Sequence, residues 1–129
     1  MPRFLLDTHA FLWWLDGDKR LSTRSRGLIR AADNEILVSA ASVWEITTKA
    51  RIGKLPGALD VAADVPASII GQGFSSLSIS VVHAQVAGGL PGPHRDPFDR
   101  VLIAQAQAER VPIVSTDAIF DAYGVTRVW

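Results

Sequence analysis

The chain has 129 residues, 48% hydrophobic and 20% charged, which fits one globular domain over residues 1–129 and excludes a disordered chain. The 13 Lys and Arg residues balance 13 Asp and Glu residues, which excludes nucleic-acid binding through bulk positive charge. The lack of cysteine excludes disulfides and thiolate chemistry. With no long apolar segment and no secretory signal in the sequence, the expected location is the cytoplasm.

Strand-like and helix-like segments alternate along the first half of the chain. FLLD (4–7) is a short apolar run that predicts a buried strand. The next segment predicts a short helix, with Thr8 as a possible cap and Gly17 as its stop. The pattern then predicts a helix, a strand and a helix, over 22–34, 35–40 and 41–54.

The same alternation continues in the second half. Asp64 and Pro66 fit the start of a helix that ends at Gly71 or Gly73. LPGPHRDP, rich in proline, predicts a loop. The remaining predicted elements are strands over 76–80, 112–117 and 125–129, and helices over 81–90, 98–110 and 118–124. Such alternation predicts an α/β fold with a parallel sheet, whose ligands bind beyond the carboxyl ends of the strands.

Two aspartates stand at the start of the helix predicted over 98–110. Asp96 followed by Pro97 fits the N-cap and first helical positions. Asp99 then falls three residues after the cap, where an acid can bond back to the cap backbone. Capping by itself explains either residue.

Three more acids have ordinary structural explanations when each is taken alone. Asp7 and Asp117 follow predicted strands, where aspartate commonly caps a helix or forms a turn. Glu45 lies inside a helix and is spaced to pair with Lys49. Taken together, these acids can face the same end of a parallel sheet. Clustered carboxylates repel one another and need a cation, and oxygen ligands favour Mg²⁺ or Mn²⁺.

Four segments, in order, resemble the PIN-domain ribonucleases, especially the VapC-type toxins of bacterial toxin–antitoxin pairs. They are DTHAFLWWL, SVWEI, HRDPFDRVLIAQA and STDAIFDAYGV. The resemblance implies a three-layer α/β/α sandwich with a central parallel sheet. It also implies a Mg²⁺-dependent (or Mn²⁺-dependent) endoribonuclease that cleaves RNA phosphodiester bonds, is inhibited by a cognate antitoxin and forms a homodimer.

Matched segment by segment, the family's catalytic and metal-binding acids fall on Asp7, Glu45, Asp99 and Asp117. Asp96 is an additional acid, which we expect to cap the helix, with metal contact through water as the alternative.

Four further residues are candidates for substrate contact, each with an ordinary structural alternative. Thr8 and Thr116 either support the carboxylates or serve as turn and cap residues. Arg95 and Arg100 either bind phosphate or pair with neighbouring acids.

Basic residues gather in one segment, which contains Lys19, Arg20, Arg24, Arg26 and Arg30. This segment either guides RNA, receives an acidic part of an antitoxin, or is a solvated helix face. Trp44 and Trp129 are expected in the core and at the sheet edge.

Two alternatives to a toxin remain open from the sequence. One is a PIN-fold nuclease of RNA processing that has no antitoxin. The other is a binding module for RNA or protein whose acids are structural and which cleaves nothing.

Overall fold

The fold comes from a computed structural model, which describes residues 1–92, 94 and 96–129. In that part of the chain, one parallel sheet has the strand order β3-β2-β1-β4-β5. The strands are β1 (Arg3–Leu6), β2 (Glu35–Ser39), β3 (Ser75–Leu77), β4 (Ile113–Val114) and β5 (Arg127–Val128).

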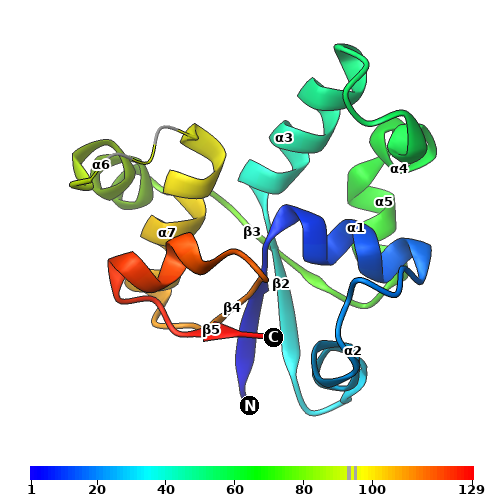
Figure 1. Cartoon of the computed structure of the whole chain (residues 1–129), viewed down its shortest axis with the longest axis horizontal. Helices are drawn as coiled ribbons and strands as arrows, with labels where there is room; N and C mark the ends of the chain where they lie inside the picture. The colour runs from blue at the N-terminus through cyan, green and yellow to red at the C-terminus, as the bar shows by residue number, and fades with distance from the viewer. Residues whose placement is uncertain (93, 95) are drawn as a thin grey trace.

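Helices connect these strands and cover both faces of the sheet (Figure 1). The α-helices described are α1 (Thr8–Asp16), α2 (Thr23–Arg30), α3 (Ala40–Arg51), α4 (Leu59–Ala63), α5 (Val65–Gly71), α6 (Val81–Gly89) and α7 (Pro97–Glu109). Two 3-10 helices are η1 (Pro56–Ala58) and η2 (Ala118–Tyr123).

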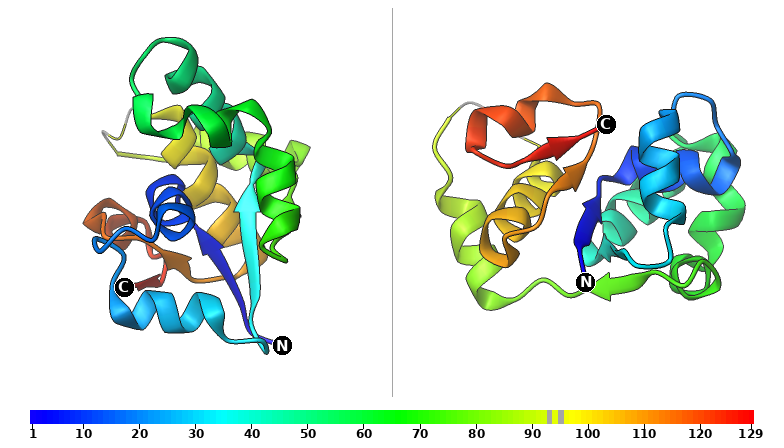
Figure 2. Two further views of the ribbon diagram at one scale, coloured as in Figure 1. Left: turned by 90° about the vertical axis from the view of Figure 1, so that its right-hand side faces the viewer. Right: turned by 90° about the horizontal axis from the view of Figure 1, so that it is seen from below.

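Strand β1 lies at the centre of the sheet and is buried on both faces. Leu5 and Leu6 are each 0% exposed, and successive side chains of a strand point to opposite faces. Leu6 belongs to an apolar cluster that includes Phe11 of α1 and Ile69 of α5, whereas Leu5 packs with Leu102 of α7. Figure 2 shows helices on either side of the strands. The expected α/β/α architecture with a parallel sheet is confirmed.

Side chains that accept backbone hydrogen bonds cap the starts of several helices. The cap of α1 differs from the sequence prediction. The cap of α1 is Asp7 and not Thr8: its Oδ1 accepts a bond of 2.8 Å from the Ala10 amide. Gly17 ends α1 as expected, in the left-handed conformation that glycine adopts without strain. Asp64 caps α5, also as expected.

Four elements in the second half differ from the sequence prediction, and one of them is the strand predicted over 112–117, which is only Ile113–Val114. The strand predicted over 76–80 is Ser75–Leu77, because Ser80 instead caps α6 by accepting a bond from the His83 amide. The helix predicted over 118–124 is the 3-10 helix η2. The strand predicted over 125–129 is reduced to Arg127–Val128, which pair with Ile113–Val114.

The expectation that Trp44 is a core residue is wrong. It is 56% exposed on the outer side of α3, where its ring meets Phe98 of α7 edge to face, with ring centroids 4.8 Å apart. Trp129 is half-buried at the edge strand β5 and packs against Trp13. No helix among the described residues has the length and apolar character required to span a membrane.

The burial of α7 against the sheet makes Leu102 a sensitive test of the fold. Leu102 is 0% exposed, so we expect Leu102→Ala to lower the free energy of unfolding by about 2–5 kcal/mol, through lost burial and the cavity left behind. Urea denaturation measures this change. The matched control is Leu59→Ala, where the leucine is 57% exposed and the same truncation is expected to cost less than about 1 kcal/mol. Equal losses in the two variants would contradict the packing described for α7.

Candidate active site

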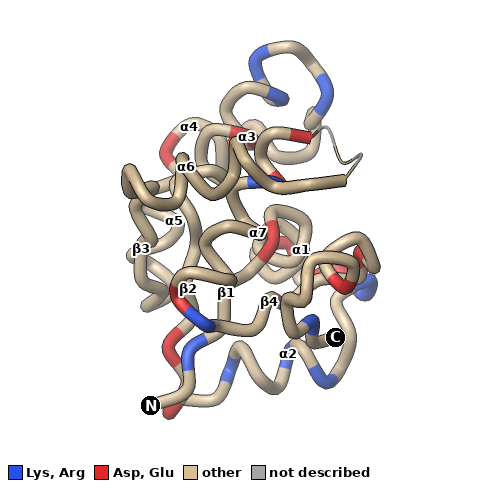
Figure 3. The backbone as a smooth tube through the Cα atoms, turned by 90° about the vertical axis from the view of Figure 1, so that its left-hand side faces the viewer, with Lys and Arg blue, Asp and Glu red and all other residues tan. Residues whose placement is uncertain are grey.

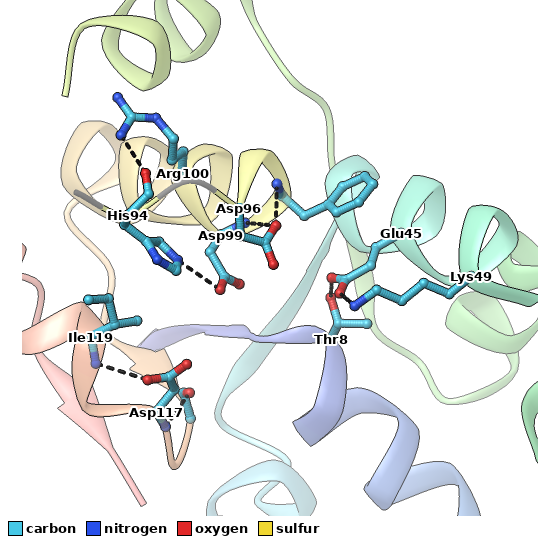
Figure 4. A network of polar contacts seen from close by, with 11 residues as sticks. Thr8, Glu45, Lys49, His94, Asp96, Asp99, Arg100, Asp117 and Ile119 are labelled. Atoms are coloured by element: carbon cyan, nitrogen blue, oxygen red, sulfur yellow. Dashed lines mark hydrogen bonds and ion pairs between the residues drawn. The ribbon is translucent and has the colours of Figure 1, made fainter. Parts of the chain in front are cut away.

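A cavity of about 460 Å³ lies at the carboxyl end of the parallel sheet, where β1 and β4 end and α3 and α7 begin. The structure brings all five acids singled out in the sequence to this cavity, four of which are seen in Figure 4. The lining residues are Asp7, Thr8, His9, Glu45, Lys49, His94, Asp96, Asp99, Thr116 and Asp117. The acids therefore converge although they come from four separate parts of the chain, and their catalytic role stays a prediction.

Three of the acids are helix N-caps, and each uses its Oδ1 for that purpose. Asp7 accepts from Ala10 at 2.8 Å, and Asp117 accepts from Ile119 at 3.0 Å. Asp96 accepts from the amides of Phe98 and Asp99, at 2.9 and 3.4 Å. These bonds place each carboxylate at the positive end of a helical segment. They leave the second oxygen of each carboxylate for another partner.

Asp99 does not share the capping role that its position allows. Its Oδ2 lies 3.0 Å from Nε2 of His94 and faces the cavity, instead of bonding back to the cap backbone (Figure 4). Burial, followed by the nearby charge of Asp96, raises the pKa of Asp99 to about 6, although the bond to His94 works in the opposite direction. The expected division between a capping Asp96 and an Asp99 turned to the cavity agrees with this geometry.

Burial also raises the pKa of Asp7, which is 7% exposed at the end of β1. Hydrogen bonds from the Ser115 side chain and the Ala10 amide oppose the rise, and the charge of Glu45 adds to it. The raised pKa values of Asp7 and Asp99 share one cause, because carboxylates that lose water and face other carboxylates are costly to ionise. A cation in the cavity would offset this cost.

Glu45 is 4% exposed and is held by partners at both of its oxygens. The Thr8 hydroxyl donates to Oε1 at 2.6 Å and lies 2.9 Å from Oγ of Ser42, while the Lys49 ammonium donates to Oε2 (Figure 4). The predicted pair between Glu45 and Lys49 is therefore present. Burial works to lower the pKa of Lys49, but the bond to and charge of Glu45 raise it overall, so that Lys49 is a cation inside an acidic cavity.

The residues expected to contact substrate divide into three groups. Thr8 and Thr116 line the cavity. Arg95 lies outside the described residues. Arg100 is not brought to the cavity, which departs from both roles considered for it. Its guanidinium donates to main-chain oxygens of Ala87, His94 and Leu90, at 3.0, 3.0 and 2.7 Å, and so ties the segment before α7 to that helix.

Sequence reasoning gave too little weight to two residues that line the cavity. Lys49 was considered only as a helical partner of Glu45, although its position one turn after a cavity residue was the available signal. His9 also lines the cavity, and the available signal was its position directly after Asp7 and Thr8.

The chemistry of the cavity fits a hard divalent cation. Its acidic donors are carboxylate oxygens, which Mg²⁺ and Mn²⁺ prefer. The cavity already holds one positive charge, on Lys49, against the most buried of these acids. Among the described residues, no three His, Asp or Glu side chains lie close enough together to form a ready-made metal-binding group.

The basic segment lies away from this cavity. Helix α2 lies near the start of β1 and β2, at the end of the sheet opposite the cavity. Several of the Lys and Arg positions drawn in Figure 3 lie along this helix. Arg20 bonds to Asp18 and stacks over the Trp13 ring, while Arg26 donates to the main-chain oxygens of Asp18 and Leu21. These contacts favour a structural and solvated role over guidance of RNA to the acids.

A family profile described as "PIN domain" matches residues 4–125 of the chain. Ribonuclease VapC16 of Mycobacterium tuberculosis (strain ATCC 25618 / H37Rv) is 41% identical over 59 residues, which are 46% of this chain. That alignment spans 42% of the relative, less than half of its length.

Solved structures of proteins from two bacteria have the same fold as this chain, at low sequence identity. A chain of VapBC2 from Rickettsia felis, bound to a DNA fragment from its promoter, is 15% identical with a TM-score of 0.70, covering 98% of this chain and 97% of that one. VapC20 of Mycobacterium tuberculosis, described as a toxin that cleaves the sarcin-ricin loop, is 17% identical with a TM-score of 0.69, covering 97% of this chain and 98% of that one.

The capping bonds of Asp96 give a prediction that does not depend on chemistry at the site. In EDTA, Asp96→Ala should lower the free energy of unfolding by about 1 kcal/mol, because two amides of the first turn of α7 lose their acceptor. Asp96→Asn keeps a side-chain oxygen and should lose less than half of that amount. Urea denaturation measures both variants, with Asp33→Ala as a control at an exposed acid in the turn before β2. A loss in Asp96→Asn as large as in Asp96→Ala would show that charge, and not capping, is what Asp96 contributes.

Proposed function

Because the chain belongs to the PIN-domain family, we propose that it is a divalent-metal-dependent endoribonuclease and the toxin of a toxin–antitoxin pair. The single observation that carries the proposal is the convergence of Asp7, Glu45, Asp99 and Asp117 on one cavity at the carboxyl end of the sheet. These are the acids on which the family's catalytic positions fall. In open sheets of parallel strands this end is where ligands bind.

Asp7, Asp99 and Asp117 would hold the metal, with Glu45 beside them. Bound there, Mg²⁺ or Mn²⁺ supplies charge that screens a phosphate and lowers the pKa of a water. Ser115 and the Ala10 amide orient Asp7, and His94 orients Asp99 from the opposite side of the carboxylate cluster. Glu45 is paired with the Lys49 ammonium, and the Thr8 hydroxyl fixes it in place.

Asp96 has a supporting role in this proposal. Its capping bonds fix the first turn of α7, and that turn carries Asp99. The same carboxylate lies at the cavity wall, where it adds negative charge that the metal offsets. Contact with the ion through a water fits this position.

The assignment to RNA and to a toxin is supported by the relatives. VapC16 is named a ribonuclease, and VapC20 is described as a toxin that cleaves the sarcin-ricin loop. VapBC2 and the Salmonella typhimurium VapBC were solved bound to DNA, the former on its own promoter. By analogy, we expect the chain to bind a cognate antitoxin that inhibits it, and to form a homodimer.

Cleavage of total RNA by the purified, antitoxin-free protein tests the activity. We expect discrete fragments with Mg²⁺ or Mn²⁺ and none with EDTA. Asp99→Asn should reduce the cleavage rate by roughly 100-fold or more, because it removes part of the charge that holds the metal, an effect of several kcal/mol.

Asp33→Asn is the matched control, since it makes the same change at an exposed acid outside the cavity, and it should cleave at the wild-type rate. Folded wild-type protein that binds Mn²⁺ and cleaves no RNA would contradict the proposal and favour a binding module. Cleavage that continues undiminished in EDTA would contradict the metal dependence.

A further inference from the structure

We propose that Lys49 is an exchangeable counter-ion of the acidic cavity, which neutralises Glu45 in the metal-free protein and binds a phosphate of the RNA backbone once a divalent cation occupies the site. This inference rests on the proposed function and assigns a substrate-binding residue to the same cavity.

A divalent cation that approaches Glu45 is repelled by the Lys49 ammonium at Oε2, whereas the neutral Thr8 hydroxyl at Oε1 does not oppose it. Both oxygens accept a hydrogen bond, Oε1 from Thr8 and Oε2 from Lys49. Thr8 is 4% exposed and is itself fixed by the buried Ser42 hydroxyl. The Lys49 side chain is 32% exposed and is a compact charge on a flexible stem. Lys49 is therefore the partner that can move.

The charge around Lys49 explains why a cation stands there in the metal-free protein. Besides Glu45, the carboxylates of Asp96 and Asp99 act on its ammonium. Without Lys49, Glu45 would be a buried charge with only a neutral hydroxyl as its partner, which is strongly unfavourable. A divalent cation supplies this positive charge instead, so that Lys49 and the metal compete for the same electrostatic role.

The released ammonium has a clear chemical use at this position. An RNA phosphate that approaches a cavity lined by five carboxylates is repelled unless a positive side chain is also present. Among the described residues that line the cavity, Lys49 is the only Lys or Arg. Arg100, which directly follows Asp99, donates its guanidinium hydrogen bonds to main-chain oxygens. Lysine binds phosphate as a point charge, which needs no fixed geometry.

Binding of Mn²⁺ to Lys49→Met, measured by calorimetry, tests the first half of the proposal. The variant should bind Mn²⁺ about tenfold more tightly than the wild type, comparable to the effect of a neighbouring unit charge on proton affinity. Its unfolding temperature should be lower than that of the wild type in EDTA and should rise more on addition of Mn²⁺. Arg30→Met is the matched control, because it removes a positive charge from an exposed site on α2 at the other end of the sheet.

Binding of a fluorescein-labelled oligouridylate, with Ca²⁺ in place of Mg²⁺, tests the second half. Loss of one phosphate contact should reduce the slope of log affinity against log salt by about 0.7, the value expected for one contact to a single strand. Lys49→Met should show this reduction, whereas Lys49→Arg and Arg30→Met should keep the wild-type slope. Lys49→Gln, which still donates a hydrogen bond to Glu45, replaces Lys49→Met if that variant does not fold.

The proposal for Lys49 requires both the tighter binding of Mn²⁺ and the smaller salt slope of RNA binding. Wild-type affinity for Mn²⁺, or a wild-type salt slope, in the uncharged Lys49 variants would overturn the proposal for Lys49. If the wild-type protein itself neither binds Mn²⁺ nor cleaves RNA, the proposed function fails instead, so the two failures are distinguishable.

Discussion

Repulsion among carboxylates is the constraint on which the candidate site depends. A parallel sheet directs the ends of β1 and β4 to one edge, and the chain places acids at both ends. Three more acids, Glu45 on α3 and Asp96 and Asp99 at the start of α7, line the same cavity, so negative charge accumulates in a small volume. Burial is the main reason that the pKa values of Asp7 and Asp99 are raised, and the neighbouring carboxylates Glu45 and Asp96 add to the rise. The surrounding structure has to hold the acids together against this repulsion.

The N-termini of helices offset part of the repulsion among the carboxylates. Asp7, Asp96 and Asp117 each cap a helical segment, so that backbone amides and the positive end of the helix offset part of each charge. A carboxylate has two oxygens, and the capping bond uses one of them. Capping and metal binding are therefore compatible roles of a single side chain, and observing the first is no argument against the second.

The rigid core fixes the geometry that the acids need. Leu102 and Ile103 of α7 are fully buried against the sheet, which sets the direction in which the first turn of that helix presents Asp99. Arg100, in the same turn, holds main-chain oxygens on α6 and in the segment after it. On the opposite side, the buried hydroxyls of Thr8 and Ser42 fix Glu45 of α3. The acids on the two sides of the cavity are thus held in place by separate sets of buried contacts.

The sequence by itself determined the alternation of strands and helices and the cap at Asp96, because these follow from local patterns of apolar residues and turn chemistry. The choice of the four candidate acids rested on the resemblance of their segments to PIN-domain ribonucleases. The sequence placed the third and last strands less well, since short strands at a sheet edge depend on pairing with distant residues. Only the tertiary structure decided which groups the long side chains contact. Arg100 turns to main-chain oxygens, Trp44 faces solvent beside Phe98, and Lys49 reaches into the cavity. Each outcome depends on which segments meet in space, and spacing along the chain does not contain that information.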